Sequence, residues 1–172
     1  MKPLIRKTCF FLLGMMISVV ARPAQTKEFL TPGEIEKIQD AQEINLRVKI
    51  YMEAASLRLK MAADRLAGKE SAPGDPFEFF SVEDMIDGYY RILRAVMLNL
   101  DDAARKPAAD PDKLQAALKN LKAVADASVK PLEFLKKTAE ETRREEMWKL
   151  AVQAIEINNG AREGAAAAIK KK

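Results

Sequence analysis

The chain of 172 residues contains no histidine and a single cysteine, Cys9. Histidine is the usual general base, and histidine with cysteine supplies most transition-metal sites, so the composition argues against an enzyme, a haem protein or a ferritin-like di-iron bundle. The formal net charge of +4 comes from 29 basic and 25 acidic residues, and the position of these charges along the chain decides which partners they favour.

Residues 1–24 have the pattern of a signal peptide. Three basic residues precede an apolar run over residues 9–21, which is too short to span a bilayer comfortably as a helix. Small residues place the expected cleavage after Ala21 or after Ala24. We therefore expect a periplasmic or secreted protein that has no stable membrane anchor after cleavage and no cysteine left to form a disulfide.

The excess of positive over negative charge comes from the two ends of the chain. Removal of the leader's three basic residues leaves 26 basic against 25 acidic residues. Between residues 28 and 169 the balance is 21 basic to 25 acidic, because Arg22, Lys27 and three terminal lysines lie outside that range. A net negative body does not attract a polyanion, so we expect no nucleic-acid partner.

The first helix start is marked by three neighbouring residues. Thr31 can cap the free amides, Pro32 suits the first helical position, and Glu34 completes a capping box. The segment Leu-Thr-Pro-Gly-Glu over residues 30–34 resembles the Leu-Thr-x-x-Gln helix starts of small periplasmic chaperones of the Spy and CpxP type, with glutamate in place of glutamine. No breaker follows for many turns, so the sequence predicts one helix from Pro32 to Ala67.

An apolar seam runs along this predicted helix. Residues 46–50 and 57–61 also alternate like strands, but strong helix formers surround them and no turn signal separates them, so a helix is favoured. Spacings of three and four, as in bundles and coiled coils, connect the seam residues, which are Ile38, Ala41, Asn45, Val48, Met52, Ala55, Leu59, Ala62 and Leu66.

A second helix is predicted from Val82 to about Arg105. Ser81 provides its cap, and Asp84 is a shorter substitute for the usual glutamate of a capping box. Pro107 ends it. Gly88 weakens its first half and either permits a close helix crossing or is simply tolerated.

The third helix begins at Asp110 and Pro111, again a cap followed by a first-position proline. Its apolar stripe keeps its register through Pro131, which predicts one long helix kinked near that residue, with two helices meeting at a corner as the alternative. An Asn-Asn-Gly sequence predicts the helix end at residues 158–160, and we expect residues 161–172 to form a frayed tail rich in alanine and lysine.

These elements predict an all-α fold. We expect an antiparallel up-down-up bundle of three long helices, or four if Pro131 is a corner, in a single domain over residues 30–160. Trp148, Val152 and Ile155 share one helical face and are expected in its core. The charge run over residues 140–146 is expected to form a solvated face.

Six residues are candidates for binding a partner. Phe77 and Phe79 lie in the connector between the first two helices, where we expect them to plug the end of the bundle, or else to be partly exposed as a contact site. Four cations flank the first seam and can meet acids of a neighbouring helix, which is the favoured interpretation, or an anionic ligand. These cations are Arg47, Lys49, Arg58 and Lys60.

The sequence therefore favours an exported, non-catalytic helical bundle that acts as a protein-protein interaction module, with a protein partner or self-association and no cofactor. A chaperone-like holdase that binds unfolded clients is the first alternative. A hydrolase that works through carboxylates alone is a second and weaker one, because no acidic residue lies in a sequence context that indicates a cleft.

Overall fold

A computed structural model describes residues 28–107 and 110–170 of the chain. The described residues form five α-helices and no strand, which confirms the all-α class. The predicted signal peptide lies outside them. None of these helices is both long enough and apolar enough to cross a membrane. The helices are α1 (Pro32–Asp40), α2 (Ile44–Leu66), α3 (Val82–Arg105), α4 (Pro111–Glu141) and α5 (Glu145–Lys170).

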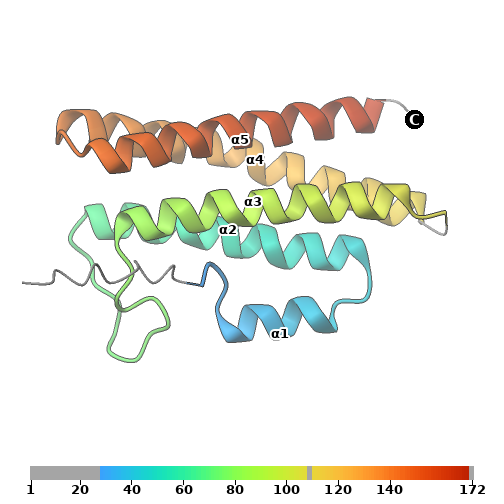
Figure 1. Ribbon diagram of the computed structural model, residues 1–172, viewed down its shortest axis with the longest axis horizontal. Coiled ribbons are helices and arrows are strands. Elements are labelled where there is room, and N and C mark those ends of the chain that lie inside the picture. The colour runs from blue at the N-terminus through green and yellow to red at the C-terminus, as the bar shows by residue number, and fades with distance from the viewer. Residues whose placement is uncertain (1–27, 108–109, 171–172) are drawn as a thin grey trace, which may run out of the picture.

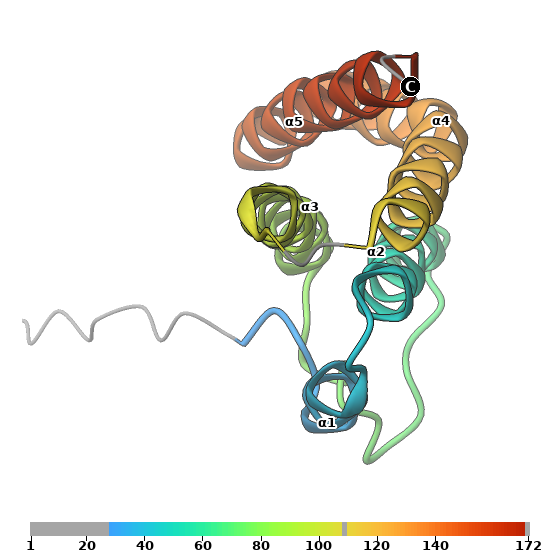
Figure 2. The ribbon, with the colours of Figure 1, turned by 90° about the vertical axis from the view of Figure 1, so that its right-hand side faces the viewer.

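The four long helices pack side by side and alternate in direction along the chain (Figure 1). Helix α2 contacts α3 on one side and α4 on the other, while α5 lies across α4 and α3. The short α1 packs against α2 on the outside of the bundle, far from α5 (Figure 2). The described residues thus form a bundle of four long helices with a short N-terminal helix packed outside it, whereas the sequence predicted three long helices, or four with a corner at Pro131.

The predicted single helix from Pro32 to Ala67 is wrong, because the chain turns between α1 and α2. Ala41 and Glu43 have extended backbone angles, and the Arg47 side chain donates a 3.0 Å hydrogen bond to the Ala41 carbonyl at this corner. The capping box of α1 is as predicted. The residues of the predicted apolar seam are buried or half-buried in both α1 and α2, on either side of the turn.

Helix α2 ends where the sequence predicts. Gly68 has a positive φ of 77°, the Gly68 amide donates to the Arg65 carbonyl, and the Lys69 amide donates to the Asp64 carbonyl. This pair of hydrogen bonds is a Schellman motif, in which glycine is favoured because only it adopts positive φ without strain. Helix α3 also has its predicted bounds and the predicted Ser81–Asp84 capping box.

Helix α4 runs through Pro131 as one element, so the predicted continuity at this proline is confirmed and the alternative of a corner there is wrong. The predicted single helix from Pro111 to residues 158–160 is also wrong, because α4 ends at Glu141. The chain turns instead at residues 142–144, which the sequence did not indicate. Arg143 has a φ of 56°, its amide donates to Glu140, and the Arg144 amide donates to Ala139. This is a second Schellman motif, with arginine in the position that glycine usually occupies.

The predicted helix end at residues 158–160 and the frayed tail are both wrong. Helix α5 continues without interruption to Lys170. Ala161 and Ala165 are buried in the bundle, so tertiary contacts hold this segment helical despite the glycine at Gly160. Trp148 is also not a core residue: it is 37% exposed, and its indole nitrogen donates to the Glu140 carboxylate at 2.8 Å.

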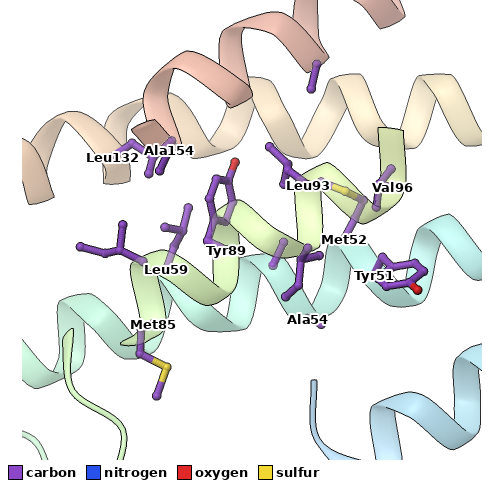
Figure 3. Packing of buried hydrophobic residues seen from close by; sticks show 14 of the residues in the cluster. Tyr51, Met52, Ala54, Leu59, Met85, Tyr89, Leu93, Val96, Leu132 and Ala154 are labelled. Carbon is purple, nitrogen blue, oxygen red and sulfur yellow. The ribbon is translucent and has the colours of Figure 1, made fainter. Parts of the chain in front are cut away.

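The core lies between the four long helices and contains one polar cluster. Tyr89 extends from α3 toward α4 and α5 (Figure 3), and its hydroxyl donates a 2.7 Å hydrogen bond to the Asn158 side-chain oxygen. The Asn158 amide nitrogen donates in turn to the Ala125 carbonyl of α4 at 3.0 Å. Each of these buried polar groups has a partner, so the cluster fixes the positions of α3, α4 and α5 relative to one another.

Candidate functional site

Arg58 is the most deeply buried charged residue among those the structure describes. Its side chain is 1% exposed and forms a bidentate ion pair with Glu34. The distance is 3.1 Å from Nη1 to Oε1 and 2.6 Å from Nη2 to Oε2. The same Nη2 donates to the Phe29 carbonyl at 2.9 Å. The Arg58 guanidinium lies 4.2 Å from the centre of the Phe77 ring. Arg58 therefore joins α2 to α1, to the N-terminal segment and to the α2–α3 loop.

Gly88 of α3 lies beside this buried arginine. A Cβ atom placed on Gly88 would lie 3.5 Å from Cδ and 3.7 Å from Cγ of Arg58. These are ordinary contact distances, so the structure agrees with the expectation that Gly88 is simply tolerated and shows no close crossing that requires glycine. The intramolecular pairing favoured for the cations from sequence is found at Arg58, although its partner belongs to α1 and not to a separate long helix.

The α2–α3 loop, residues 67–81, is held by a second arginine. The Arg65 guanidinium donates to the carbonyls of Phe77 at 2.6 Å and Phe80 at 3.1 Å, and to the Ser71 hydroxyl at 2.9 Å. Consecutive turns are closed by hydrogen bonds from Asp75 to Ala72, from Glu78 to Asp75 and from Phe80 to Phe77. The loop is therefore a defined structure that is held in place by charged hydrogen bonds.

The two loop aromatics predicted as a pair have different positions. Phe77 is 6% exposed, and its ring meets the Phe80 ring edge-on at 5.4 Å between centroids, so this ring is buried against Phe80 and Arg58. Phe79 is 81% exposed, so the exposure that the second alternative expects is found at this residue. Phe77 thus fixes the loop from inside, and Phe79 presents an aromatic ring at its outer surface.

The other predicted cations are more exposed than Arg58. Arg47 secures the α1–α2 corner through its bond to Ala41, and Lys49 forms a long 4.0 Å contact with Glu53 on the solvent side of α2. Lys60 is exposed on the same helix. The structure does not bring these four cations together into one site.

A polar cavity of about 340 Å³ lies near the N-termini of α2 and α4 and includes Glu43, Asp102 and Asp110 in its lining. Each of these carboxylates has a partner: Glu43 binds Lys113 at 2.8 Å and Asp102 binds Lys106 at 2.6 Å, while Asp110 accepts two backbone amides at the start of α4. The bond from Lys106 lowers the pKa of Asp102, and the two amides lower the pKa of Asp110. A general acid needs a raised pKa, so this geometry does not favour acid-base catalysis.

Sequence reasoning missed an apolar groove at the end of the bundle where α3 and α5 end. It holds about 250 Å³, and α3 and α5 form its walls over a floor from α4. The only charged residue in its lining is Asp101. The groove was not predicted because part of one wall belongs to the segment after Gly160, which was expected to form a frayed tail. Among its lining residues are Met97, Leu100, Leu118, Leu121, Gly160 and Gly164.

No group of three or more metal-ligating side chains occurs within residues 28–107 and 110–170. The chain matches no known family model, no curated protein and no solved structure.

Proposed function

We propose that this protein is an exported, non-catalytic interaction module that binds a protein partner through the α2–α3 loop, with Phe79 as the anchor. The observation that carries the proposal is the 81% exposure of Phe79 on a loop that Arg65 and Phe77 hold in place. The predicted leader supports the export, and the composition supports a role without catalysis.

An aromatic ring on a fixed loop is well suited to binding. Burial of an exposed phenylalanine side chain contributes about 1.5–3 kcal/mol, and aromatic residues in the centre of interfaces carry a large share of binding energy. Because the loop is held by internal hydrogen bonds, little conformational entropy is lost when a partner covers it. Phe79 is thus positioned to contribute about a ten- to hundred-fold gain in affinity.

Photocrosslinking tests this assignment. A photoreactive phenylalanine analogue is placed at Phe79, and in a matched control at Phe134, which is an exposed phenylalanine on α4. One dominant crosslinked protein at Phe79 supports a dedicated interaction module. A broad set of unrelated unfolded clients favours the holdase alternative. Capture at Phe79 that does not exceed capture at Phe134 contradicts the proposal.

A pair of substitutions separates binding from folding. Phe79→Ser is expected to abolish partner capture and to leave the melting temperature within about 2 °C, because the side chain is exposed. Phe77→Ser removes a buried ring that contacts Arg58 and is expected to unfold the loop. Undiminished capture by the folded Phe79→Ser protein would show that the anchor lies elsewhere.

A further inference from the structure

We propose that the partner of the α2–α3 loop presents a basic segment, in which an arginine stacks on the exposed Phe79 ring and pairs with the acidic residues around it. This inference rests on the proposed function, because it names the chemistry of the partner that Phe79 binds. Two observations support it. Arginines near this loop each contact both an aromatic ring and a carboxylate, and the surroundings of the loop are acidic.

Arg58 shows how a cation is held on this side of the bundle. Its guanidinium lies 4.2 Å from the centre of the Phe77 ring and pairs with the Glu34 carboxylate at 2.6 Å. A planar guanidinium can stack on an aromatic face and form two parallel hydrogen bonds with a carboxylate, which the compact ammonium of lysine cannot do. A ring and a carboxylate together thus form a site that favours arginine.

A second arginine has the same pair of contacts. The Arg91 guanidinium lies 4.6 Å from the centre of the Phe29 ring, and its Nη1 is 3.7 Å from the Asp87 carboxylate. Phe29 precedes α1, while Phe77 belongs to the α2–α3 loop, and α1 and this loop lie on the same side of the bundle, opposite α5 (Figure 2). Two aromatic rings associated with this side therefore each hold an arginine.

Phe79 is a third aromatic ring of this region, and it is 81% exposed. Two carboxylates of its loop are fixed by backbone amides: Glu78 accepts from Gly74 at 2.8 Å, and Asp75 accepts from Phe77 at 2.7 Å. These hydrogen bonds hold the carboxylates in place without neutralising their charge. An arginine of another molecule can therefore meet a ring and fixed carboxylates on one surface.

Acidic residues outnumber basic ones around this loop. Residues 64–84 contain six acidic and two basic side chains, and Arg144 adds one cation by pairing with Glu83 at 2.6 Å. By contrast, residues 111–170, which include α4 and α5, contain nine acidic and eleven basic side chains. The acidic residues around the loop are Asp64, Glu70, Asp75, Glu78, Glu83 and Asp84, and the two basic ones are Arg65 and Lys69. The charge around Phe79 thus favours a basic partner.

Peptide binding by the purified protein tests this chemistry. The probe is a short fluorescent peptide in which arginine alternates with leucine, and matched peptides carry lysine or glutamate in place of arginine. In fluorescence anisotropy at low salt, we expect the arginine peptide to bind at least about three-fold more tightly than the lysine peptide, and the glutamate peptide not to bind. The affinity should fall as the salt concentration rises, because exposed charges are then screened.

Substitutions in the loop locate the bound peptide. Glu70→Gln, Asp75→Asn and Glu78→Gln together remove three charges but keep the oxygens that accept the loop amides. This triple variant is expected to bind the arginine peptide at least about five-fold more weakly. Phe79→Ser removes the ring and should also reduce the preference for arginine over lysine, since only arginine stacks well on the ring.

The matched control removes three charges from the other side of the bundle. Glu133→Gln in α4, with Glu156→Gln and Glu163→Gln in α5, replaces exposed residues and should change the affinity by less than about two-fold. Circular dichroism checks that both triple variants are folded. Glu70→Gln alone, at an exposed position, is the second loop variant and should still bind the peptide more weakly than the control.

Several results would overturn the inference. These are an arginine peptide that binds no more tightly than the lysine or glutamate peptide, and an equal loss of affinity in the loop and control variants. The Phe79 photocrosslinker separates these failures from a failure of the proposed function. If the arginine peptide does not bind while the crosslinker captures one dominant protein, the proposed function stands and only the basic partner is wrong. If nothing is captured, both fail.

Discussion

Removal of one charge at the Arg58–Glu34 pair tests how the buried arginine is held. In the capping box the Thr31 amide nitrogen donates to Oε2 of Glu34 at 2.8 Å. Glu34→Gln keeps the size of the side chain and leaves an oxygen that can accept this hydrogen bond. It removes the negative charge that faces a guanidinium only 1% exposed. The substitution therefore isolates the ionic part of the contact.

The expected cost follows from the burial of both partners. Removal of one partner of a buried ion pair costs about 3–5 kcal/mol, because the other charge stays desolvated. The Glu34 side chain is 15% exposed, and the Phe29 carbonyl still accepts from Arg58, so we expect the low end, about 3 kcal/mol. For a chain of this size the melting temperature should fall by roughly 6–12 °C.

Chemical denaturation followed by circular dichroism measures this loss, with Glu36→Gln as the matched control. Glu36 is exposed on the same helix, and its substitution should change the unfolding free energy by less than about 0.5 kcal/mol. Adding Arg58→Met to Glu34→Gln should recover part of the loss, since no charge is then left buried. Equal stability of Glu34→Gln and Glu36→Gln would refute the reasoning.

Three further predictions concern the core. Tyr89→Phe leaves the buried Asn158 oxygen without its donor and should cost about 1–3 kcal/mol in urea unfolding, so an unchanged midpoint would argue against the Tyr89–Asn158 bond. Gly88→Ala should stabilise α3 by up to about 1 kcal/mol, because the added Cβ makes an ordinary contact with Arg58, and a lower melting temperature would show that Arg58 cannot accommodate it. Burial raises the pKa of Tyr89 and of Tyr51 above their ordinary value, so their neutral forms stabilise the fold fully below about pH 10, and this stability is lost as the pH rises further. Absorbance at 295 nm should therefore show these two tyrosines ionising only as the helix signal falls, and ionisation of every tyrosine near pH 10 in an intact helical protein would contradict this.

Local chemistry made several elements predictable. The caps at Thr31, Ser81 and Asp110 lie within a few residues of the backbone groups they satisfy, and each appears where predicted. The turn at Arg143 was not predicted, because arginine and not glycine occupies the left-handed position there. Glycine at that position is the usual sequence sign of a helix end.

The candidate site was only partly predictable, because many of its contacts join residues that are far apart in the sequence. Phe77 and Phe79 were found as a pair of loop aromatics, but their spacing did not show which ring turns inward. Arg65, which holds the loop, was missed because its acceptors are backbone carbonyls 12 and 15 residues away. The groove was missed because the burial of Ala161 and Ala165 depends on contacts with other helices.

Capping and hydrophobic periodicity act over one or two helical turns, so the all-α class, the capped helix starts and the apolar seams could be read from the sequence alone. The packing of α1 back onto α2 and the extension of α5 past Gly160 depend on contacts between helices and could not be read from the sequence. In one straight helix Glu34 and Arg58 would be 24 residues and about 36 Å apart, whereas the turn at residues 41–43 brings their charged atoms to 2.6 Å. A buried charge needs a partner wherever the fold can supply one, and long-range contacts of this kind leave no periodic trace in the sequence.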